Sequence, residues 1–227
     1  MYNAWHELEV NKVNKMTAPD SSNEYTKGRL TRNELDPDPL VQFDRWYTQA
    51  WDASIPYPHA MSLATASPDG TPSLRTVFLK QADRAGFVFF THYQSPKARD
   101  IEHRSEVALL FLWKPLERQV TVTGHAAKIS AADSSAYYST RSRGSQLGAI
   151  ISPQSQVIPS RDYLHERFKV TDEAYSSKPI ERPDHWGGYC VTPGTIEFWQ
   201  GRPNRLNDRF MYTANDDQSW AIQRLAP

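Results

Sequence analysis

Basic and polar side chains lie inside otherwise apolar stretches at several places in this 227-residue sequence. In the run from Ser73 to Lys80, Arg75 lies inside and Lys80 ends the stretch. Arginine offers a phosphate two parallel hydrogen bonds, and lysine offers a compact positive charge. Five residues of spacing place the two on opposite faces of a regular strand, so they need not bind one group. A salt bridge at the end of a barrel and a phosphate contact are both consistent with this run.

A second set consists of Tyr137, Arg141 and Ser145. Tyr137 and Arg141 are four residues apart on a predicted helix and therefore share a face. If that helix ends near Gly144, Ser145 begins the next element, where free backbone N–H groups favour an anion. Two hydroxyls and a guanidinium suit a phosphomonoester, and a solvated helix face is the alternative.

The third set follows Phe198-Trp-Gln200, where Arg205, Asn207 and Arg209 stand at alternate positions. In an extended backbone these three side chains point the same way, which places two positive charges on one face. Like charges at that spacing repel unless an anion or an electron-rich ring lies between them. Ion pairs with Asp208 or Glu197 are the structural alternative.

Common catalytic motifs are absent from the sequence. It contains no H-E-x-x-H, no paired C-x-x-C, no G-x-S-x-G, no G-x-x-x-x-G-K-[ST] and no G-x-G-x-x-G. No zinc site, simple hydrolase site or Rossmann dinucleotide site is therefore indicated, and we predict no metal. If the protein is an enzyme, a bound cofactor is expected to supply the chemistry.

Bulk properties exclude several classes of protein. The 26 basic and 26 acidic residues cancel, whereas a nucleic-acid or membrane-surface protein usually carries a basic excess. Cys190 is the only cysteine, which suits a reducing compartment. The longest apolar run, 107–113, is far shorter than the roughly 20 residues that span a bilayer. We predict a soluble, cytoplasmic protein without nucleic-acid or membrane partners.

The elements that must position these residues are mostly strands. Residues 1–35 are polar and predict a mobile arm, and 36–227 predict one domain. A helix is expected from Asp38-Pro39 to about residue 53. Strands separated by short turns favour an antiparallel barrel, so the predicted fold is mainly β with peripheral helices. The expected strands are 61–66, 73–80, 86–92, 107–113, 118–129, 188–191, 195–200, 209–213 and 220–225, and the expected further helices are 96–104, 131–143 and 162–176.

Several motifs in this order make the chain resemble the pyridoxamine 5'-phosphate oxidase family over nearly nine-tenths of its length. They are Glu24-Tyr-Thr-Lys-Gly28, Arg75-Thr-Val-Phe-Leu-Lys80, Glu117-Arg-Gln119, Tyr137 with Arg141 and Ser145, Gln154-Ser155, Trp186-Gly-Gly188 and Phe198-Trp-Gln200. The resemblance implies an FMN-binding split β-barrel that forms a homodimer with FMN at the subunit interface. The residues that it implies for FMN, some from the partner subunit, are Arg75, Thr76, Val77, Phe78, Leu79, Lys80, Phe90, Thr91, Lys97, Gln119, Gln154, Ser155, Trp199 and Arg209.

The resemblance also implies a reaction. Pyridoxamine 5'-phosphate and pyridoxine 5'-phosphate would be oxidised by O2 to pyridoxal 5'-phosphate in vitamin B6 metabolism, with release of H2O2 and, from the amine, ammonia. Substrate-binding residues would be Lys80, Tyr137, Arg141, Ser145 and the lid tyrosine Tyr25. Arg205 and Asn207 would bind the substrate at its reacting carbon and form the catalytic pair.

Three positions depart from the family pattern. Asn207 stands where the family usually has His, Pro96 replaces an Arg before Lys97, and Ser22 replaces an Arg in the arm. We expect altered turnover or affinity and an unchanged reaction class. One alternative is a related split-barrel flavin oxidase with another substrate, such as a phenazine precursor. The other is a flavin- or pyridoxal-phosphate-binding protein without turnover.

Overall fold

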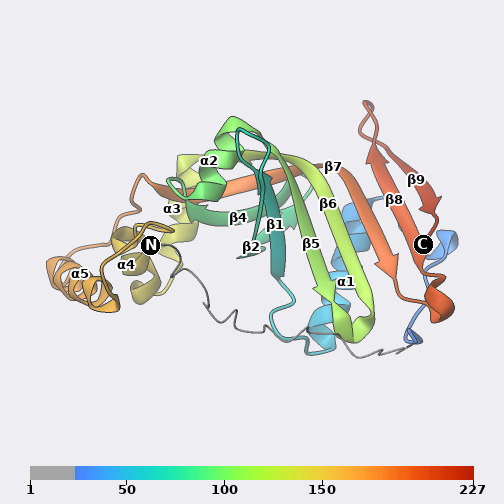
Figure 1. Ribbon diagram of the computed structural model, residues 1–227, viewed down its shortest axis with the longest axis horizontal. Helices are drawn as coiled ribbons and strands as arrows, with labels where there is room; N and C mark the ends of the chain where they lie inside the picture. Colours follow the sequence, from blue (N-terminus) through green and yellow to red (C-terminus); the bar gives the residue numbers. More distant parts are fainter. Residues whose placement is uncertain (1–23) are drawn as a thin grey trace, which may run out of the picture.

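The computed structural model describes residues 24–227, so the predictions for residues 1–23, including Ser22, lie outside the described part. Within it, nine antiparallel strands form one sheet in the order β2-β1-β5-β6-β7-β4-β3, and β8 pairs with β7 and β9 (Figure 1). The strands are β1 (Ala60–Ala66), β2 (Pro72–Phe78), β3 (Gln81–Asp83), β4 (Gly86–His92), β5 (Glu106–Trp113), β6 (Arg118–Lys128), β7 (Trp186–Gln200), β8 (Asp208–Ala214) and β9 (Trp220–Leu225).

The chain between β2 and β3 forms hydrogen bonds to two sides of the curled sheet. Leu79 N donates to His59 O (2.8 Å), at the start of β1, and Lys80 N donates to Val88 O (2.8 Å), in β4. These two bonds connect the β1–β2 side of the sheet to β4, and the curled sheet encloses the core (Figure 1). The prediction of a mainly β fold with peripheral helices is confirmed.

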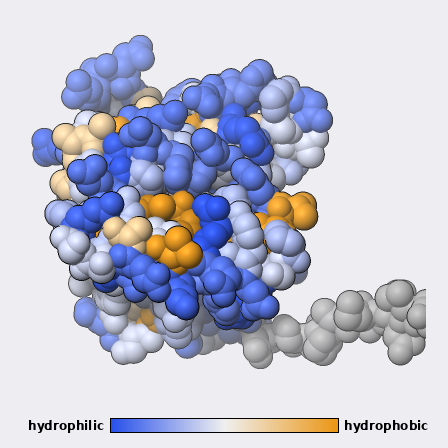
Figure 2. All heavy atoms as spheres, turned by 90° about the vertical axis from the view of Figure 1, so that its left-hand side faces the viewer, coloured by the Kyte–Doolittle hydropathy of each residue, from blue (hydrophilic) through white to orange (hydrophobic). Residues whose placement is uncertain are grey.

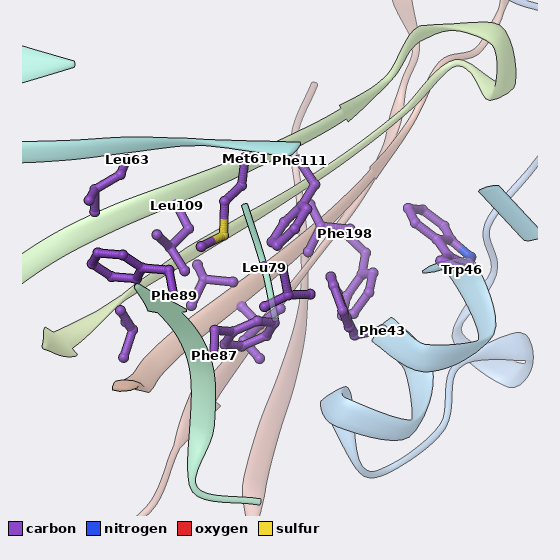
Figure 3. Close-up of a cluster of buried hydrophobic side chains, with 14 of the residues drawn as sticks. Phe43, Trp46, Met61, Leu63, Leu79, Phe87, Phe89, Leu109, Phe111 and Phe198 are labelled. Atoms are coloured by element: carbon purple, nitrogen blue, oxygen red, sulfur yellow. The ribbon is translucent and has the colours of Figure 1, made fainter. Parts of the chain in front are cut away.

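Helix α1 (Pro39–Asp52) packs against one side of the curled sheet. It begins where the Asp38 side chain accepts a hydrogen bond from Leu40 N and Pro39 occupies the first turn, as the sequence predicts. Phe43 and Trp46 are buried at helical spacing. Figure 3 shows Phe43 pointing toward Phe87 of β4, and their rings meet edge to face at 5.0 Å between centroids. The helix therefore supplies part of the aromatic core.

Four further helices surround the sheet: α2 (Pro96–His103), α3 (Ala131–Ser139), α4 (Arg143–Ile151) and α5 (Arg161–Ala174). Short 3-10 turns cover Arg32–Glu34 (η1), Lys114–Leu116 (η2) and Pro203–Arg205 (η3). The helices α3, α4 and α5 lie together at one end of the molecule (Figure 1). No residue of α5 is buried, and the face at this end is largely hydrophilic with a small hydrophobic area near its centre (Figure 2).

The prediction of one helix over 131–143 is wrong. Helix α3 ends at Ser139, and α4, which was not predicted, begins at Arg143. The hydroxyls of Ser139 and Thr140 donate to the carbonyls of Ala136 and Tyr137. Such bonds offer the backbone an alternative to continuing the helix, which explains the break.

The prediction of two strands separated by a turn at Pro193-Gly194 is also wrong, because β7 is continuous. Its pairing with β6 shifts between Thr123↔Thr195 and Gly124↔Pro193, which leaves Gly194 as the extra residue of a β-bulge. Since both halves pair with the same long strand, the chain does not turn. The buried residues change from Tyr189 and Val191 before the bulge to Ile196 and Phe198 after it.

The described end of the predicted arm lies against the sheet. Leu30 and Leu35 are 3% and 7% exposed, and Leu30 N donates to the carboxylate of Asp208. Tyr212 Oη donates to Asp36 O (2.7 Å) just beyond them. Among residues 24–227, no helix is long and apolar enough to cross a membrane.

Candidate functional site

A cavity of about 750 Å³ lies between β2, β4 and the helical end of the molecule. All but two of its lining residues, Ser142 and Trp186, are among the predicted site residues. The lining consists of Arg75, Thr76, Val77, Phe78, Lys80, Phe90, Thr91, Lys97, Tyr137, Arg141, Ser142, Ser145, Gln154, Ser155 and Trp186. Strands, helix starts and a loop far apart in the sequence thus converge on one space.

Lys97 projects into this cavity from the first turn of α2. Its Nζ donates to Gln154 Oε1 (2.8 Å), Ser95 Oγ (3.1 Å) and Thr91 Oγ1 (3.2 Å). The side chain is buried, and burial, followed by the nearby Arg75, lowers the pKa of Lys97 to about 8. Pro96 precedes it at the first helical position, where proline is favoured. No carboxylate among residues 24–227 forms an ion pair with Lys97.

Arg75 lies beside Lys97 on β2, with Asp100 of α2 behind it. Its guanidinium donates to Leu63 O (3.0 Å), to Thr65 Oγ1 (2.7 Å) and to the Ser73 hydroxyl. Asp100 is 3.9 Å away and accepts a bond from Thr65. Burial lowers the pKa of Arg75, and the Asp100 charge opposes that shift. The side chain is therefore oriented before any ligand binds.

Arg141 is a second cation of this cavity that has no carboxylate partner within the described chain. Its Nη1 is buried and has no hydrogen-bond partner. Burial lowers the pKa of Arg141, while Tyr137 and Tyr138 oppose the shift. Ser145 accepts a bond from the Ser142 hydroxyl (2.8 Å). It lies in the first turn of α4, near a helix start as expected, although that helix begins at Arg143 and not after Gly144. A half-buried guanidinium with an unpaired Nη1 next to a helix start is suited to an anion.

Lys80 completes the positive lining at the mouth of the cavity. It lies two residues beyond the end of β2, so the alternation of a regular strand does not fix its direction. This explains why Arg75 and Lys80 line the same space although their spacing alone predicts opposite faces. The ammonium lies 5.5 Å from the centroid of the exposed Phe78 ring. Leu79 between them is buried in the core and does not line the cavity.

The remaining predicted site residues lie elsewhere, around the other end of β7. Gln119, Trp199 and Arg209 are cross-strand neighbours on β6, β7 and β8. Tyr25 meets the Trp199 ring edge to face at 5.6 Å. Trp199 is thirteen residues along β7 from Trp186, or roughly 40 Å at strand spacing. We call these residues, together with Arg205 and Asn207, the C-terminal group.

The expected extended face of Arg205, Asn207 and Arg209 is a wrong prediction. Arg205 ends the turn η3 with φ +61° and an exposed side chain. Asn207 Oδ1 accepts a bond from Arg202 N (3.0 Å) and so fixes the loop. Arg209 Nε donates to Glu197 Oε1 (2.7 Å), a bond that raises the pKa of Arg209. Pro203 cannot donate to a ladder, and the chain turns here instead of continuing as a strand.

A pair of histidines behind Lys97 was missed by sequence reasoning. The His92 and His185 rings stack at 4.4 Å, and His92 is 5% exposed. His92 Nδ1 accepts a bond from Gln94 N (3.1 Å), which requires that nitrogen to be unprotonated. Burial, then His185, then Lys97 lower the pKa of His92. No motif signals this pair, whereas Trp186, the other omission, lies in the Trp186-Gly-Gly188 motif.

Two family models match the chain. The model described as "Pyridoxamine 5'-phosphate oxidase" matches residues 47–172, and "Pyridoxine 5'-phosphate oxidase C-terminal dimerisation region" matches residues 186–227. Proteins named pyridoxine/pyridoxamine 5'-phosphate oxidase are similar along nearly their whole length. The one from Rippkaea orientalis is 55% identical over 90% of this chain and 96% of its own, and the one from Rubrobacter xylanophilus is 50% identical over 90% and 94%.

Solved structures agree on the fold. PhzG from Burkholderia lata 383, in complex with tetrahydrophenazine-1-carboxylic acid, has a TM-score of 0.81 at 26% identity and covers 87% of this chain and 98% of its own. A pyridoxamine 5'-phosphate oxidase-related, FMN-binding protein from Nostoc punctiforme has a TM-score of 0.69 at 19% identity, covering 85% and 100%. The predicted split-barrel fold is confirmed.

Proposed function

This chain belongs to the pyridoxamine 5'-phosphate oxidase family, and from that premise we propose that it is an FMN-dependent oxidase producing pyridoxal 5'-phosphate. Its substrates are pyridoxamine 5'-phosphate and pyridoxine 5'-phosphate, and O2 is reduced to H2O2, with ammonia released from the amine. The observation that carries the proposal is one cavity with two cations that lack carboxylate partners within residues 24–227, the buried Lys97 and the half-buried Arg141.

The donor set fits FMN at the Lys97 side of the cavity. A phosphate there would meet the charges of Lys97 and Arg75 and the polar groups of Thr91, Gln154 and Ser155. The backbone of β2 from Thr76 and the ring of Phe90 would lie along the rest of the cofactor. When bound, FMN supplies the electron-accepting and oxygen-reducing chemistry that no side chain of the cavity offers.

The Arg141 side of the same cavity fits the phosphate of the substrate. Arg141 and Lys80 supply positive charge, and Tyr137 and Ser145 supply hydroxyls. Their role is to bind and orient the substrate, so the reacting carbon is held in place through a distant phosphate. Arg205 is assigned to the reacting end of the substrate. Asn207, which is bonded to the Arg202 backbone, positions the loop that carries Arg205.

The protein acts as a homodimer in this proposal, because one chain separates its two groups of site residues. Roughly 40 Å of β7 lies between the cavity and Trp199. The family model that matches residues 186–227 is a dimerisation region. Gln119, Trp199, Arg205 and Arg209 of one subunit therefore complete the cavity of the other, with Tyr25 next to them.

The first experiment measures whether the protein binds FMN and whether it oxidises pyridoxine 5'-phosphate. Protein reconstituted with FMN is expected to show flavin absorbance and to consume O2 when pyridoxine 5'-phosphate is added. Arg205→Ala should retain FMN and lose most turnover, whereas Arg161→Ala on the exposed helix α5 should resemble the wild type. A protein that cannot bind FMN would refute the proposal, and FMN binding without turnover would favour the non-catalytic alternative.

A complementation experiment tests the shared site. Lys97→Met alters the cavity and Arg205→Ala alters the C-terminal group, so each homodimer should be inactive when it is assayed without excess FMN. In a heterodimer of the two variants, isolated with two affinity tags, one site carries both changes and the other carries neither. We expect about half of the wild-type activity per dimer, because two-fold symmetry creates two equivalent sites. No recovery would mean that both groups serve the same chain's site.

A second candidate function is oxidation of a substrate without phosphate. The similarity to PhzG, whose structure contains tetrahydrophenazine-1-carboxylic acid, favours it. Lys80, Arg141 and Ser145 favour a phosphorylated substrate instead, since the single charge of a carboxylate would compensate these two cations less completely than a phosphate group does. Comparing kcat/KM for pyridoxine and pyridoxine 5'-phosphate separates the two, and a preference for unphosphorylated pyridoxine would support the second candidate.

A further inference from the structure

Three aromatic rings from three separate elements lie nearly parallel beside the cavity. Phe90 of β4 and Tyr137 of α3 stack at 4.0 Å with 19° between their planes. Phe90 and Trp186, the first residue of β7, stack at 5.3 Å and 12°. Tyr138 meets Trp186 edge to face at 5.2 Å. Trp186 thus contacts both β4 and α3 at the point where the cavity lining passes from strand to helix.

The same indole supports the unpaired guanidinium. Arg141 lies 4.6 Å from the centroid of the Trp186 ring, and its buried Nη1 has no hydrogen-bond partner. A ring face attracts a cation without neutralising it, unlike a carboxylate, which would compete with a ligand for the guanidinium. Arg141 is therefore held in place while its hydrogen-bonding capacity stays available.

Trp186 is itself fixed by two neighbours. It is 7% exposed, and its carbonyl accepts a bond from Arg182 Nη1 (2.6 Å). Arg182 Nε also donates to Ser135 Oγ (3.0 Å), which connects the start of β7 to α3. Helix α3 buries only Ser134 and Tyr138. The contact with Trp186 is accordingly a large part of what orients the α3–α4 corner, on which Tyr137, Arg141 and Ser145 lie.

We propose that Trp186 is a positioning residue that holds Arg141 and Tyr137 in the geometry required by a phosphate group of the ligand. The inference rests on the proposed function for the identity of that ligand. If Trp186 merely filled space in the core, its substitution would lower the stability of the protein and the affinities for all ligands alike. A positioning role instead affects the phosphate-dependent part of affinity and leaves FMN binding at the Lys97 side intact.

The test compares Trp186→Leu and Trp186→Phe in FMN-loaded protein. We expect Leu to raise KM for pyridoxine 5'-phosphate on the order of tenfold, the loss of one cation–π contact in a desolvated site. kcat at saturation should change by less than about threefold, since the reacting groups are not touched. Phe keeps a ring face under Arg141 and should recover most of the affinity. FMN affinity should stay unchanged in both variants.

Trp46 offers a matched control at another part of the barrel. It is 4% exposed and carries Arg118 at 4.5 Å from its ring, the same arrangement as Trp186 with Arg141. Trp46→Leu should lower the melting temperature without raising KM. If both Leu variants raise KM equally, the effect of Trp186 is only structural. Should Trp186→Leu fail to fold, Arg182→Ala removes the bonds that fix Trp186 and should raise KM by a smaller factor.

A double-mutant cycle with Arg141→Leu shows whether Trp186 acts through Arg141. We expect the loss of pyridoxal 5'-phosphate affinity in the double variant to be smaller than the sum of the two single losses, because Trp186 acts in part through Arg141, and fully additive losses would overturn the proposal. In Trp186→Leu, the affinity for inorganic phosphate, measured as a competitor, should fall together with the affinity for pyridoxal 5'-phosphate. This binding readout needs no turnover. A wild type that binds both anions without oxidising substrate would refute the proposed function and leave the role of Trp186 testable.

Discussion

The cavity and the C-terminal group differ in whether their positively charged side chains have carboxylate partners. In the cavity, Lys97 is surrounded by hydroxyls and an amide, and Arg141 lies on an indole ring. In the C-terminal group, Arg209 is paired with Glu197 at 2.7 Å. Asp208 accepts two further arginines, Arg202 at 3.5 Å and Arg224 at 2.8 Å. Positive charge is kept available in one region and compensated in the other.

The difference indicates which cations await an anion. Burying a charge without a partner costs free energy. We expect such a charge only where another interaction, such as the binding of an anion, offsets that cost. Lys97 and Arg141 meet this description, and the paired arginines of the C-terminal group do not. Arg205 is the exception in that group, since its side chain is exposed on a turn. Its exposure is consistent with the proposed role in the cavity of a partner subunit.

Lys97→Met tests the first half of this comparison and should have the largest effect. Removing one charged hydrogen bond to a phosphate should weaken FMN binding on the order of 100-fold. Without FMN, the variant should unfold at a higher urea concentration than the wild type, because a buried unpaired charge has been removed. Lys169→Met on the exposed face of α5 should change neither quantity. A less stable apo-variant would contradict the idea that the charge is uncompensated.

The pH dependence of FMN binding should sharpen the same point. The pKa of Lys97 is lowered to about 8, so its charge disappears as pH rises above 8. FMN affinity should fall by up to about tenfold per pH unit there. Between pH 8 and the ordinary lysine range, the folded apo-protein binds fewer protons than the unfolded chain. Its unfolding free energy should therefore rise with pH. In Lys97→Met, neither the FMN affinity nor the unfolding free energy should change with pH in this range. If both depend on pH in the variant as they do in the wild type, Lys97 is not the source.

The smallest effect is expected from Glu197→Gln in the C-terminal group. The ion pair with Arg209 is partly buried, so the substitution should lower the unfolding free energy by about 1 kcal/mol. The exposed pair between Lys128 and Glu102 provides the control, and Glu102→Gln should cost much less. Urea denaturation measures both. A Glu197→Gln variant as stable as the wild type would show that charge compensation is not what Arg209 contributes.

Local sequence patterns were sufficient for much of the fold. Asp38-Pro39 marks the start of α1, and runs rich in Val, Leu and Phe mark most strands. The chemistry of single residues pointed to Arg75, Lys80, Tyr137, Arg141 and Ser145, whereas Lys97 and most of the other lining residues followed only from the family resemblance. Motif order supplied the family, which no single residue could have done.

What the sequence could not give depends on contacts between distant segments. Pro193-Gly194 has the composition of a turn, and only the continuous partner β6 makes it a bulge. Arg205 and Arg209 stand at alternating positions of the sequence, but the turn that begins at Pro203 orients Arg205 and the bond to Glu197 orients Arg209. The His92–His185 stack joins β4 to the segment before β7. None of these contacts leaves a periodic trace in the chain.

The bulge at Gly194 sets the phase of β7. Odd-numbered residues such as Tyr189 and Val191 face the core before it, and even-numbered residues such as Ile196 and Phe198 face the core after it. Trp186 lies before the bulge and Trp199 lies after it. The alternation of a regular strand therefore does not predict which faces these two side chains lie on. Loss of a single residue here would rotate the far half by one face, burying Trp199 and exposing Phe198. The extra residue at Gly194 therefore determines which face of the sheet Trp199 lies on, and with it the geometry of the proposed shared site.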